Sequence, residues 1–362
     1  MSKTFRIAVL PGDGIGPEVT APCLAILDKV ASQSDGAFAL EFQNIDAGAA
    51  YYAQHGLSLP DAGMTSAAKA DAILLAAMGL PSVRYPDGTE IAPQLELREA
   101  FQLYAGVRPI RTIGGVPLPL ADPRGQSLDI VLVRESTEGL FASRGKTFVA
   151  DDDSYATDEM RISRDVCERL FDFSFRLARE RKARGRAGRV TCIDKANVIG
   201  SLAYFRKIFL ERAAAFPDIE ADFAYVDAMA LNLVKRPWDY DVLVTENMFG
   251  DILSDLGAAL MGGLGMAPSA DIGDHQAVFQ PCHGSAPDIA GQNKANPSAM
   301  VLSGAMMLQW LGEKHGVSQA QLAAQRIESA VAKAFADGTL LPGEFGGTAS
   351  TSEIGKAILH CL

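Results

Sequence analysis

Short apolar runs alternate with amphipathic stretches along most of the chain. Runs typical of buried strands cover residues 5–10, 70–78, 128–133, 189–193, 221–226 and 240–245. A helix is expected from about Glu18, and another over 163–182, where Ser163 is the expected N-cap and the last turn is basic. Strands that are apolar throughout are buried on both faces of a sheet. The alternation of such strands with helices predicts an α/β fold.

Polar residues follow several of these strands directly. Arg134 follows 128–133, Lys195 comes soon after 189–193, and Asp227 follows 221–226. Open α/β sheets bind ligands beyond the carboxyl ends of their strands. The placement therefore indicates one ligand site at that edge of the sheet.

The segment TENMFGDILSD (245–255) carries a pair of acids at helical spacing. Asp251 and Asp255 are four residues apart, which places both carboxylates on one face of a helix. No Lys or Arg on this helix neutralises the pair, and like charges at this spacing repel each other. A divalent cation would turn the repulsion into binding, because hard cations prefer carboxylate oxygens. A solvated helix face is the alternative, and the segment alone leaves both interpretations open.

Two glycine-containing segments are candidates for cofactor contacts. PGDGIGPE (11–18) does not match the dinucleotide fingerprint G-x-G-x-x-G, because Pro17 stands at its third position. The loop HGSAPDIAGQNKANP (283–297) has small residues that allow close approach of a ligand, and Asp288 could accept hydrogen bonds from ribose hydroxyls. An acid at that point favours NAD, since it would repel a 2′-phosphate. An ordinary surface loop is the alternative.

Arg98, Arg108 and Arg134 would form a polycarboxylate site if they converge, because guanidinium groups bind carboxylates bidentately. Lys195 could act as a base and Asp227 as a third metal carboxylate. Taken singly, each arginine is an ordinary surface charge, the lysine a structural residue and Asp227 a turn residue.

Composition narrows the function classes. The 362 residues are 48% hydrophobic and 21% charged, as in ordinary globular proteins, and the net charge is −11. That charge argues against a nucleic-acid or anionic-membrane partner. The five cysteines lack CxxC spacing, as expected for reduced thiols, and no signal peptide or apolar membrane span is evident. We therefore expect a cytoplasmic protein. Separately, the irregular segment 143–160 is expected to form an exposed arm or hairpin.

Taken together, the motifs resemble those of the isocitrate/isopropylmalate dehydrogenase family, the metal-dependent β-decarboxylating dehydrogenases, with 3-isopropylmalate and tartrate/D-malate dehydrogenases nearest. The matches are LPGDGIGPEV (10–19), LREAFQLYAGVRP (97–109, an apolar, helix-like stretch), VRESTEGLF (133–141), DKANV (194–198), YVDAMA (225–230), ENMFGDILSDL (246–256) and HGSAPDIAGQNKANP (283–297). They follow the family's order over nearly the whole chain, and their combination is specific although no single motif is.

The resemblance implies a fold, an activity and a role for each matching residue. It implies a two-domain α/β fold that is not a Rossmann fold, with a discontinuous first domain (1–103 plus 262–362) and a central dimerisation and substrate domain (104–261). It implies NAD- and Mg²⁺- or Mn²⁺-dependent oxidative decarboxylation of a substituted malate by a homodimer that shares its active sites, Lys195 and Asp227 reaching the partner's site. The implied substrate contacts are Arg98, Arg108, Arg134, Gln94 and Leu95; the catalytic residues Lys195 and Asp227; the metal ligands Asp227, Asp251 and Asp255; and the NAD contacts His283, Gly284, Ser285, Ala286, Asp288, Asn296 and Ile15.

Two positions depart from the family pattern. Phe141 stands where the family has a tyrosine tied to the final protonation, and phenylalanine has no hydroxyl to donate. Gln94 stands where isopropylmalate enzymes carry a leucine, and an apolar substituent would leave its amide unsatisfied. The expected activity is therefore 3-isopropylmalate dehydrogenase-like, with a tartrate/D-malate-type enzyme and a non-catalytic ligand-binding member as alternatives. Whether Glu90 meets the nicotinamide stays open.

Overall fold

A single mixed sheet runs through the molecule, which is described over residues 3–362 by a computed structural model. Its strand order is β2-β1-β3-β12-β11-β4-β5-β10-β8-β9. The strands are β1 (Lys3–Gly12), β2 (Phe38–Asn44), β3 (Ala72–Ala77), β4 (Ala105–Arg111), β5 (Asp129–Glu135), β8 (Arg189–Asp194), β9 (Glu220–Tyr225), β10 (Val242–Thr245), β11 (Pro268–Ile272) and β12 (Ala277–Pro281). Strands from the two ends of the chain therefore lie together, and the central segment supplies the other side of the sheet.

The direction of the strands changes in the middle of the sheet. β11 is antiparallel to both β12 and β4, and β4 is antiparallel to β5, whereas all other neighbours are parallel. Every residue of β3 is buried, as its uniformly apolar sequence predicts. The α/β class is confirmed, and the antiparallel centre distinguishes this sheet from the all-parallel Rossmann arrangement.

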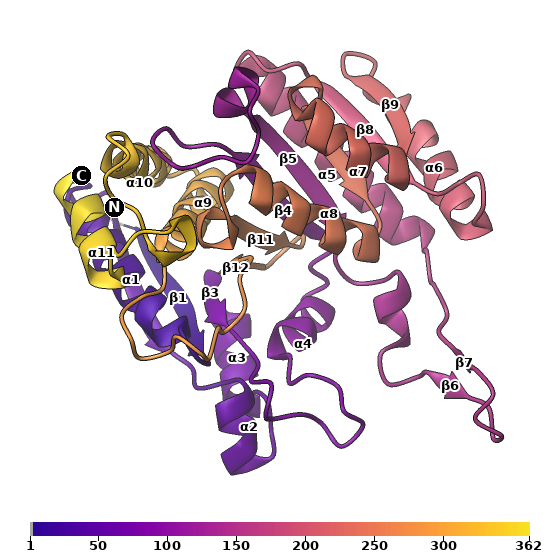
Figure 1. The fold of residues 1–362 in the computed structure, drawn as a ribbon, viewed down its shortest axis with the longest axis horizontal. Coiled ribbons are helices and arrows are strands. Elements are labelled where there is room, and N and C mark those ends of the chain that lie inside the picture. The colour runs from indigo at the N-terminus through magenta and orange to yellow at the C-terminus, as the bar shows by residue number, and fades with distance from the viewer. Residues whose placement is uncertain (1–2) are drawn as a thin grey trace.

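Helices cover both parts of the sheet (Figure 1). In that view α1 and α9–α11 gather beside the chain termini, while α5–α8 pack around β8–β10 at the other end. The helices are α1 (Gly16–Ser32), α2 (Ala49–His55), α3 (Asp61–Lys69), α4 (Pro93–Ala100), α5 (Arg164–Ala183), α6 (Gly200–Ala213), α7 (Val226–Lys235), α8 (Asn247–Leu260), α9 (Ser298–His315), α10 (Ser318–Phe335) and α11 (Thr351–His360). Short 3₁₀ turns connect them, and η2 (Leu140–Ser143) is the one that matters for the site.

The stretch 97–109 corrects the helix-like interpretation of its sequence. Helix α4 ends at Ala100, Gln102 adopts a left-handed conformation with φ of 50°, and residues from Ala105 onward form β4. The strand is favoured because it pairs on both sides, with β5 and β11. Arg98 and Arg108 thus come from a helix and from a strand.

Ser163 precedes α5 as expected, but its side chain does not cap the helix. Its hydroxyl instead donates to the Glu138 carboxylate at 2.7 Å. The 143–160 segment contains the expected hairpin, in which β6 (Phe148–Val149) pairs with β7 (Ala156–Thr157). Figure 1 shows it projecting from the molecule, with exposed apolar side chains at Phe148, Val149 and Tyr155.

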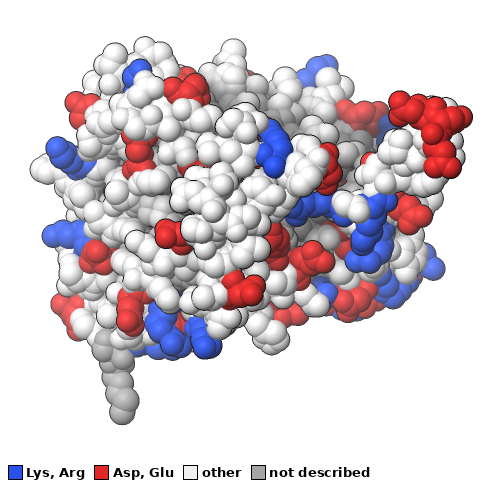
Figure 2. Space-filling model, turned by 90° about the horizontal axis from the view of Figure 1, so that it is seen from below, with Lys and Arg blue, Asp and Glu red and all other residues white. Residues whose placement is uncertain are grey.

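Charged side chains of both signs share the surface seen in Figure 2, with more of them toward one end than toward the other. None of the helices within residues 3–362 is both long enough and apolar enough to cross a bilayer.

Candidate active site

A cavity of about 650 Å³ brings together most of the residues expected to contact substrate, cofactor and metal. We call it the clamp cavity. It is bounded by α4, β4, β5, η2, α8 and the loop after β12. The expected site residues that line it are Gln94, Leu95, Arg98, Arg108, Arg134, Phe141, Asp251, Asp255, His283, Gly284, Ser285 and Ala286.

The arginines of the cavity are nearly inaccessible to solvent. Arg98 and Arg108 are each 6% exposed and Arg134 is 3% exposed, because they extend from α4, β4 and β5 into the interior. Arg134 has room only because residue 250 on α8 is glycine, since a Cβ there would lie 2.6 Å from the Arg134 side chain. The three guanidinium groups therefore converge, as a site for carboxylates requires.

Asp271 on β11 lies beneath these arginines, and sequence reasoning missed it. It is 1% exposed, and its Oδ2 accepts hydrogen bonds from Arg98 Nε at 3.0 Å and Gln280 Nε2 at 2.8 Å. Its Oδ1 accepts from Ser136 Oγ at 3.1 Å. The only available signal was an acid inside an otherwise uncharged strand, PSADI, because a buried acid requires a partner.

The pKa values reflect how crowded the positive charges are. Burial, then the neighbouring Arg98, lowers the pKa of Arg134 to about 10. Burial opposes ionisation of Asp271, but the surrounding arginines outweigh it and lower the pKa of that carboxyl. Arg108 Nε is buried with no hydrogen-bond partner among residues 3–362. An anion with several carboxylate oxygens would relieve the repulsion and satisfy this donor.

Asp251 and Asp255 lie on the same side of α8 and both line the clamp cavity, as their spacing predicts. As the sequence indicates, α8 itself carries no Lys or Arg, but Arg134 reaches across from β5 and donates from Nη1 to Asp251. Burial, followed by the charge of Asp251, raises the pKa of Asp255. Within residues 3–362, no group of three or more His, Cys, Asp or Glu side chains is placed so that it could hold a metal ion.

Lys195 and Asp227 form a separate pair outside the clamp cavity. Lys195 follows β8, Asp227 lies in the first turn of α7, and Lys195 Nζ is 2.5 Å from Asp227 Oδ1. The hydrogen bond from Lys195 holds the pKa of Asp227 below its usual value. Both side chains are partly or largely exposed, at 27% and 67%. Neither residue lines the clamp cavity, which the three arginines do.

The segment expected to contact the cofactor is divided. His283, Gly284, Ser285 and Ala286 line the clamp cavity, and Ile15 N donates to Ser285 O at 2.8 Å. Burial lowers the pKa of His283, whose Nε2 is buried without a partner among the described residues. Its Nδ1 lies 3.0 Å from the Gly284 carbonyl oxygen, so Nε2 is the ring nitrogen open to a further hydrogen bond.

The other residues expected near the cofactor or the reacting part of the substrate lie at the edge of the clamp cavity or outside it. Asp288 is exposed beside this segment, and Asn296 is buried with its amide donating to Glu344 at 2.6 Å. Glu90 lines the clamp cavity and pairs with Arg84 at 3.4 Å. Phe141 also lines the cavity, with its ring centroid 5.4 Å from the Arg134 guanidinium carbon.

Comparison with known proteins identifies the class to which this fold and this cavity belong. The family model for isocitrate/isopropylmalate dehydrogenase matches residues 6–358. The chain therefore belongs to the isocitrate/isopropylmalate dehydrogenase family, a family of oxidoreductases.

Individual relatives are similar over their full length. The 3-isopropylmalate/3-methylmalate dehydrogenase of Methanocaldococcus jannaschii is 39% identical over 355 residues, covering 98% of this chain and 97% of that protein. The tartrate dehydrogenase/decarboxylase of Pseudomonas putida is 38% identical, covering 100% and 98%. The crystal structure of isocitrate dehydrogenase from Methylococcus capsulatus superposes with a TM-score of 0.84 at 35% identity, covering 99% of both chains.

Proposed function

We propose that this protein catalyses the NAD- and Mg²⁺- or Mn²⁺-dependent oxidative decarboxylation of a 3-substituted malate, in the manner of 3-isopropylmalate dehydrogenase. The observation that carries the proposal is the clamp cavity, in which three buried arginines face a pair of aspartates. Such a set matches a substrate with two carboxylates and a hydroxyl, because the arginines bind the carboxylates and the aspartates hold a hard cation. Similarity to the named relatives supports the same class of reaction.

The arginines would bind and orient the substrate. Arg98 is held by Asp271 and Arg134 by Asn247, whose Oδ1 accepts from Arg134 Nε at 2.9 Å. Arg108 keeps an unpartnered Nε for the ligand. Side chains that are fixed before binding lose little entropy when the substrate arrives, so the reacting carbon is placed reproducibly.

The residues fit a divalent cation and a nicotinamide cofactor. Asp251 and Asp255 offer oxygens on one face of α8, and the unpartnered His283 Nε2 lies beside the small residues of the 283–286 segment. When bound, NAD⁺ accepts the hydride, while the cation acidifies the substrate hydroxyl and stabilises the charge left as CO₂ departs. Asp288 would then contact the ribose and favour NAD.

A homodimer would complete each site with Lys195 and Asp227 of the partner subunit. The helices near this pair carry large apolar side chains that one chain leaves exposed, namely Ile252 on α8, Leu231 and Val234 on α7, and Val198 before α6. Covering such side chains is what a dimer interface does. In the dimer, Lys195 would accept the proton of the substrate hydroxyl. We place this interface on the central segment, 104–261, and the cofactor site on 1–103 with 262–362.

The last step, protonation of the enol, lacks its usual tyrosine donor. Phe141 occupies that place in the cavity and supplies only a ring against Arg134. Another group must deliver this proton, or oxidation proceeds without complete decarboxylation. A tartrate- or D-malate-type enzyme is the second candidate, since Gln94 lines the substrate cavity.

The test is a substrate panel with Mn²⁺ and NAD⁺ in which NADH and CO₂ are followed in parallel. We expect turnover of at least one 3-substituted malate that stops when EDTA is added. Formation of NADH without CO₂ would assign the loss of decarboxylation to Phe141, and Phe141→Tyr should then restore CO₂ release. If no malate is oxidised while binding of malates persists, the protein is a ligand-binding family member and the proposal is wrong.

A further inference from the structure

The chain has two partly exposed cysteines, and one of them lies in the clamp cavity. Cys282 and Cys361 are partly exposed, whereas Cys23, Cys167 and Cys192 are buried. Burial raises the pKa of Cys23 to about 12 and also raises the pKa of the other two buried thiols. These three thiols therefore stay protonated, and only the thiolate form of cysteine is a good nucleophile. Reaction with a solvent-borne reagent is left to Cys282 and Cys361.

Cys282 follows β12 and is held against an arginine of the clamp. Its backbone N donates to Ala267 O at 3.0 Å, which fixes its position beside β11. Its Sγ accepts a hydrogen bond from Arg108 Nη1 at 3.1 Å and lies 3.7 Å from Pro268 O. A guanidinium group in contact with a cysteine sulfur favours the ionised, nucleophilic form of the side chain. The contact with Arg108 therefore marks Cys282 as the reactive thiol of the cavity.

Arg108 supplies the second, independent observation. Its side chain is 6% exposed and lines the clamp cavity, and its Nε has no hydrogen-bond partner among the described residues. Burial opposes the charge on Arg108, but the sulfur of Cys282 and the carboxylate of Asp271 outweigh it and raise the pKa of that guanidinium group. The cation is therefore permanent, and it keeps one donor for a further anionic acceptor. A charged oxygen bound to the Cys282 sulfur would be such an acceptor.

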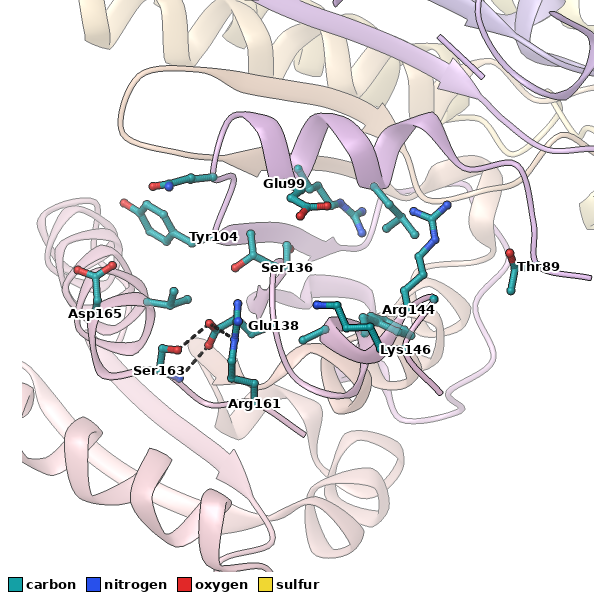
Figure 3. Close-up of a pocket in the computed structure, with 18 of the residues that line it drawn as sticks. Thr89, Glu99, Tyr104, Ser136, Glu138, Arg144, Lys146, Arg161, Ser163 and Asp165 are labelled. Carbon is teal, nitrogen blue, oxygen red and sulfur yellow. Dashed lines mark hydrogen bonds and ion pairs between the residues drawn. The ribbon is translucent and has the colours of Figure 1, made fainter. Parts of the chain in front are cut away.

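A small reagent reaches this thiol through the cleft. The clamp cavity, of about 650 Å³, shares Arg98 and Phe141 with a neighbouring cavity of about 680 Å³. Figure 3 shows charged side chains along this second cavity, among them Glu99, Arg144 and Lys146. Polar walls of this kind hold water, and hydrogen peroxide, which is small and uncharged, moves with water. In the enzyme without substrate, the Cys282 sulfur is therefore open to peroxide.

We propose that Cys282 is an oxidation site that closes the clamp: hydrogen peroxide converts its thiolate to a sulfenate, whose charged oxygen occupies Arg108 in place of a substrate carboxylate. In this step an S–O bond forms, the O–O bond breaks, and the sulfur gives two electrons to the peroxide. The leaving hydroxide takes the proton of the new sulfenic acid, so that a sulfenate and water remain.

A low-molecular-weight thiol reverses the modification. It condenses with the sulfenic acid to a mixed disulfide and releases water, and a second molecule of the thiol then cleaves that disulfide and restores the Cys282 thiol. The oxidation itself does not depend on the substrate. Only its consequence for malate binding rests on the proposed function, because that function assigns Arg108 to a carboxylate.

The first measurement is the rate of labelling at each cysteine. The full-length protein is exposed to hydrogen peroxide together with a cyclic 1,3-dione that traps sulfenic acids, and the labelled peptides are followed by mass spectrometry. We expect Cys282 to be labelled about tenfold faster than Cys361, or more. Arg108→Gln should slow labelling of Cys282 on the order of tenfold, whereas Arg108→Lys, which keeps the charge, should slow it less.

Cys361 is the matched control within the same chain. It is also partly exposed, but it lines a separate cavity in which Arg326 donates to Gln33 and to Leu362 O. Equal rates of labelling at the two cysteines would overturn the inference. The same holds if Cys282 in Arg108→Gln is labelled as fast as in the wild type.

The second measurement is activity before and after peroxide. Oxidation should raise the KM of the wild-type enzyme for its malate on the order of tenfold to a hundredfold, because Arg108 no longer offers a charged hydrogen bond, and dithiothreitol should restore it. Cys282→Ser should keep through the treatment whatever activity it starts with, whereas Cys361→Ser should respond as the wild type does. Loss of activity in Cys282→Ser at the wild-type rate would contradict closure of the clamp by this thiol.

Saturating malate separates this inference from the proposed function. A malate bound to Arg108 should slow the labelling of Cys282 and leave that of Cys361 as it is. Fast labelling of Cys282 that no malate slows would confirm the oxidation site and contradict the assignment of Arg108 to a substrate carboxylate. The two failures are thus distinguishable.

Discussion

The arginine clamp and the Lys195–Asp227 pair are two charged groups that the same chain organises in opposite ways. Arg98, Arg108 and Arg134 are almost fully buried; Asp271 on β11 holds Arg98, and Asn247 on α8 holds Arg134. Lys195 and Asp227 pair with each other at 2.5 Å, and their side chains are 27% and 67% exposed. The clamp is therefore held within one chain, whereas the pair lies outside the clamp cavity and reaches a substrate only in the proposed dimer.

The two groups differ in what compensates the free-energy cost of holding their charges in place. Removing arginines from water is unfavourable, so the fold must supply Asp271 and a carboxylate on α8 to compensate. An exposed ion pair contributes little to stability, so the pair with Asp227 does not by itself account for the position of Lys195. Its position makes physical sense if a second subunit receives it.

The largest effect is expected from the exposed pair. Lys195→Met should lower kcat about 10²–10⁴-fold, because the base is lost, with little change in melting temperature. Asp251→Asn should be similarly inactive, because the proposed cation site loses one of its carboxylates. When both variants are unfolded together and refolded as a mixture, hybrid dimers regain one intact site, so about a quarter of wild-type activity should return. A mixture as inactive as its components would show that the sites are not shared.

In the buried arginine clamp, removal of a counter-ion should first lower the stability of the fold. Asp271→Ala leaves Arg98 buried without its partner, and the free energy of unfolding in urea should fall by about 3–5 kcal/mol. Asp271→Asn is the control, since it keeps the acceptor for Arg98 and should cost less. An Asp271→Ala variant as stable as the wild type would mean that the clamp does not depend on this carboxylate.

The proposed interface can be tested beside the exposed pair. Ile252 is 62% exposed on α8, and Ile252→Asp should weaken dimerisation on the order of a hundredfold, because it places a charge in an apolar contact. Leu322 on α10, which is 49% exposed at the other end of the molecule, is the matched site. Sedimentation should show dissociation for Ile252→Asp only; equal behaviour of the two variants would move the interface elsewhere.

Local patterns were enough to predict the α/β class, the placement of Asp251 and Asp255 on one face of a helix, and the strand at 72–77. Each of these features follows from residues that are close in sequence. They could not predict Asp271, whose role depends on side chains brought from α4 and β5. The change from α4 to β4 was missed for the same reason, since pairing with β5 and β11 decides it. Long-range contacts also place Arg134 against Asp251, and no property of the α8 sequence contains that information.

The smallest expected effect concerns the strand that carries the clamp. Burial raises the pKa of Glu135, next to Arg134 on β5, from 4.5 to about 7. Between those values the folded state holds a proton that the unfolded state has lost, so this group stabilises the fold below pH 4.5 and loses that contribution as pH rises toward 7. One proton limits the slope to about 1.4 kcal/mol per pH unit. Glu135→Gln should flatten the urea-derived stability profile over this window, whereas Glu168→Gln, at a half-exposed site on α5, should not. A profile in Glu135→Gln as steep as the wild type's would mean that Glu135 is already ionised throughout this pH window, held by its bonds to the Thr137 and Glu138 amides.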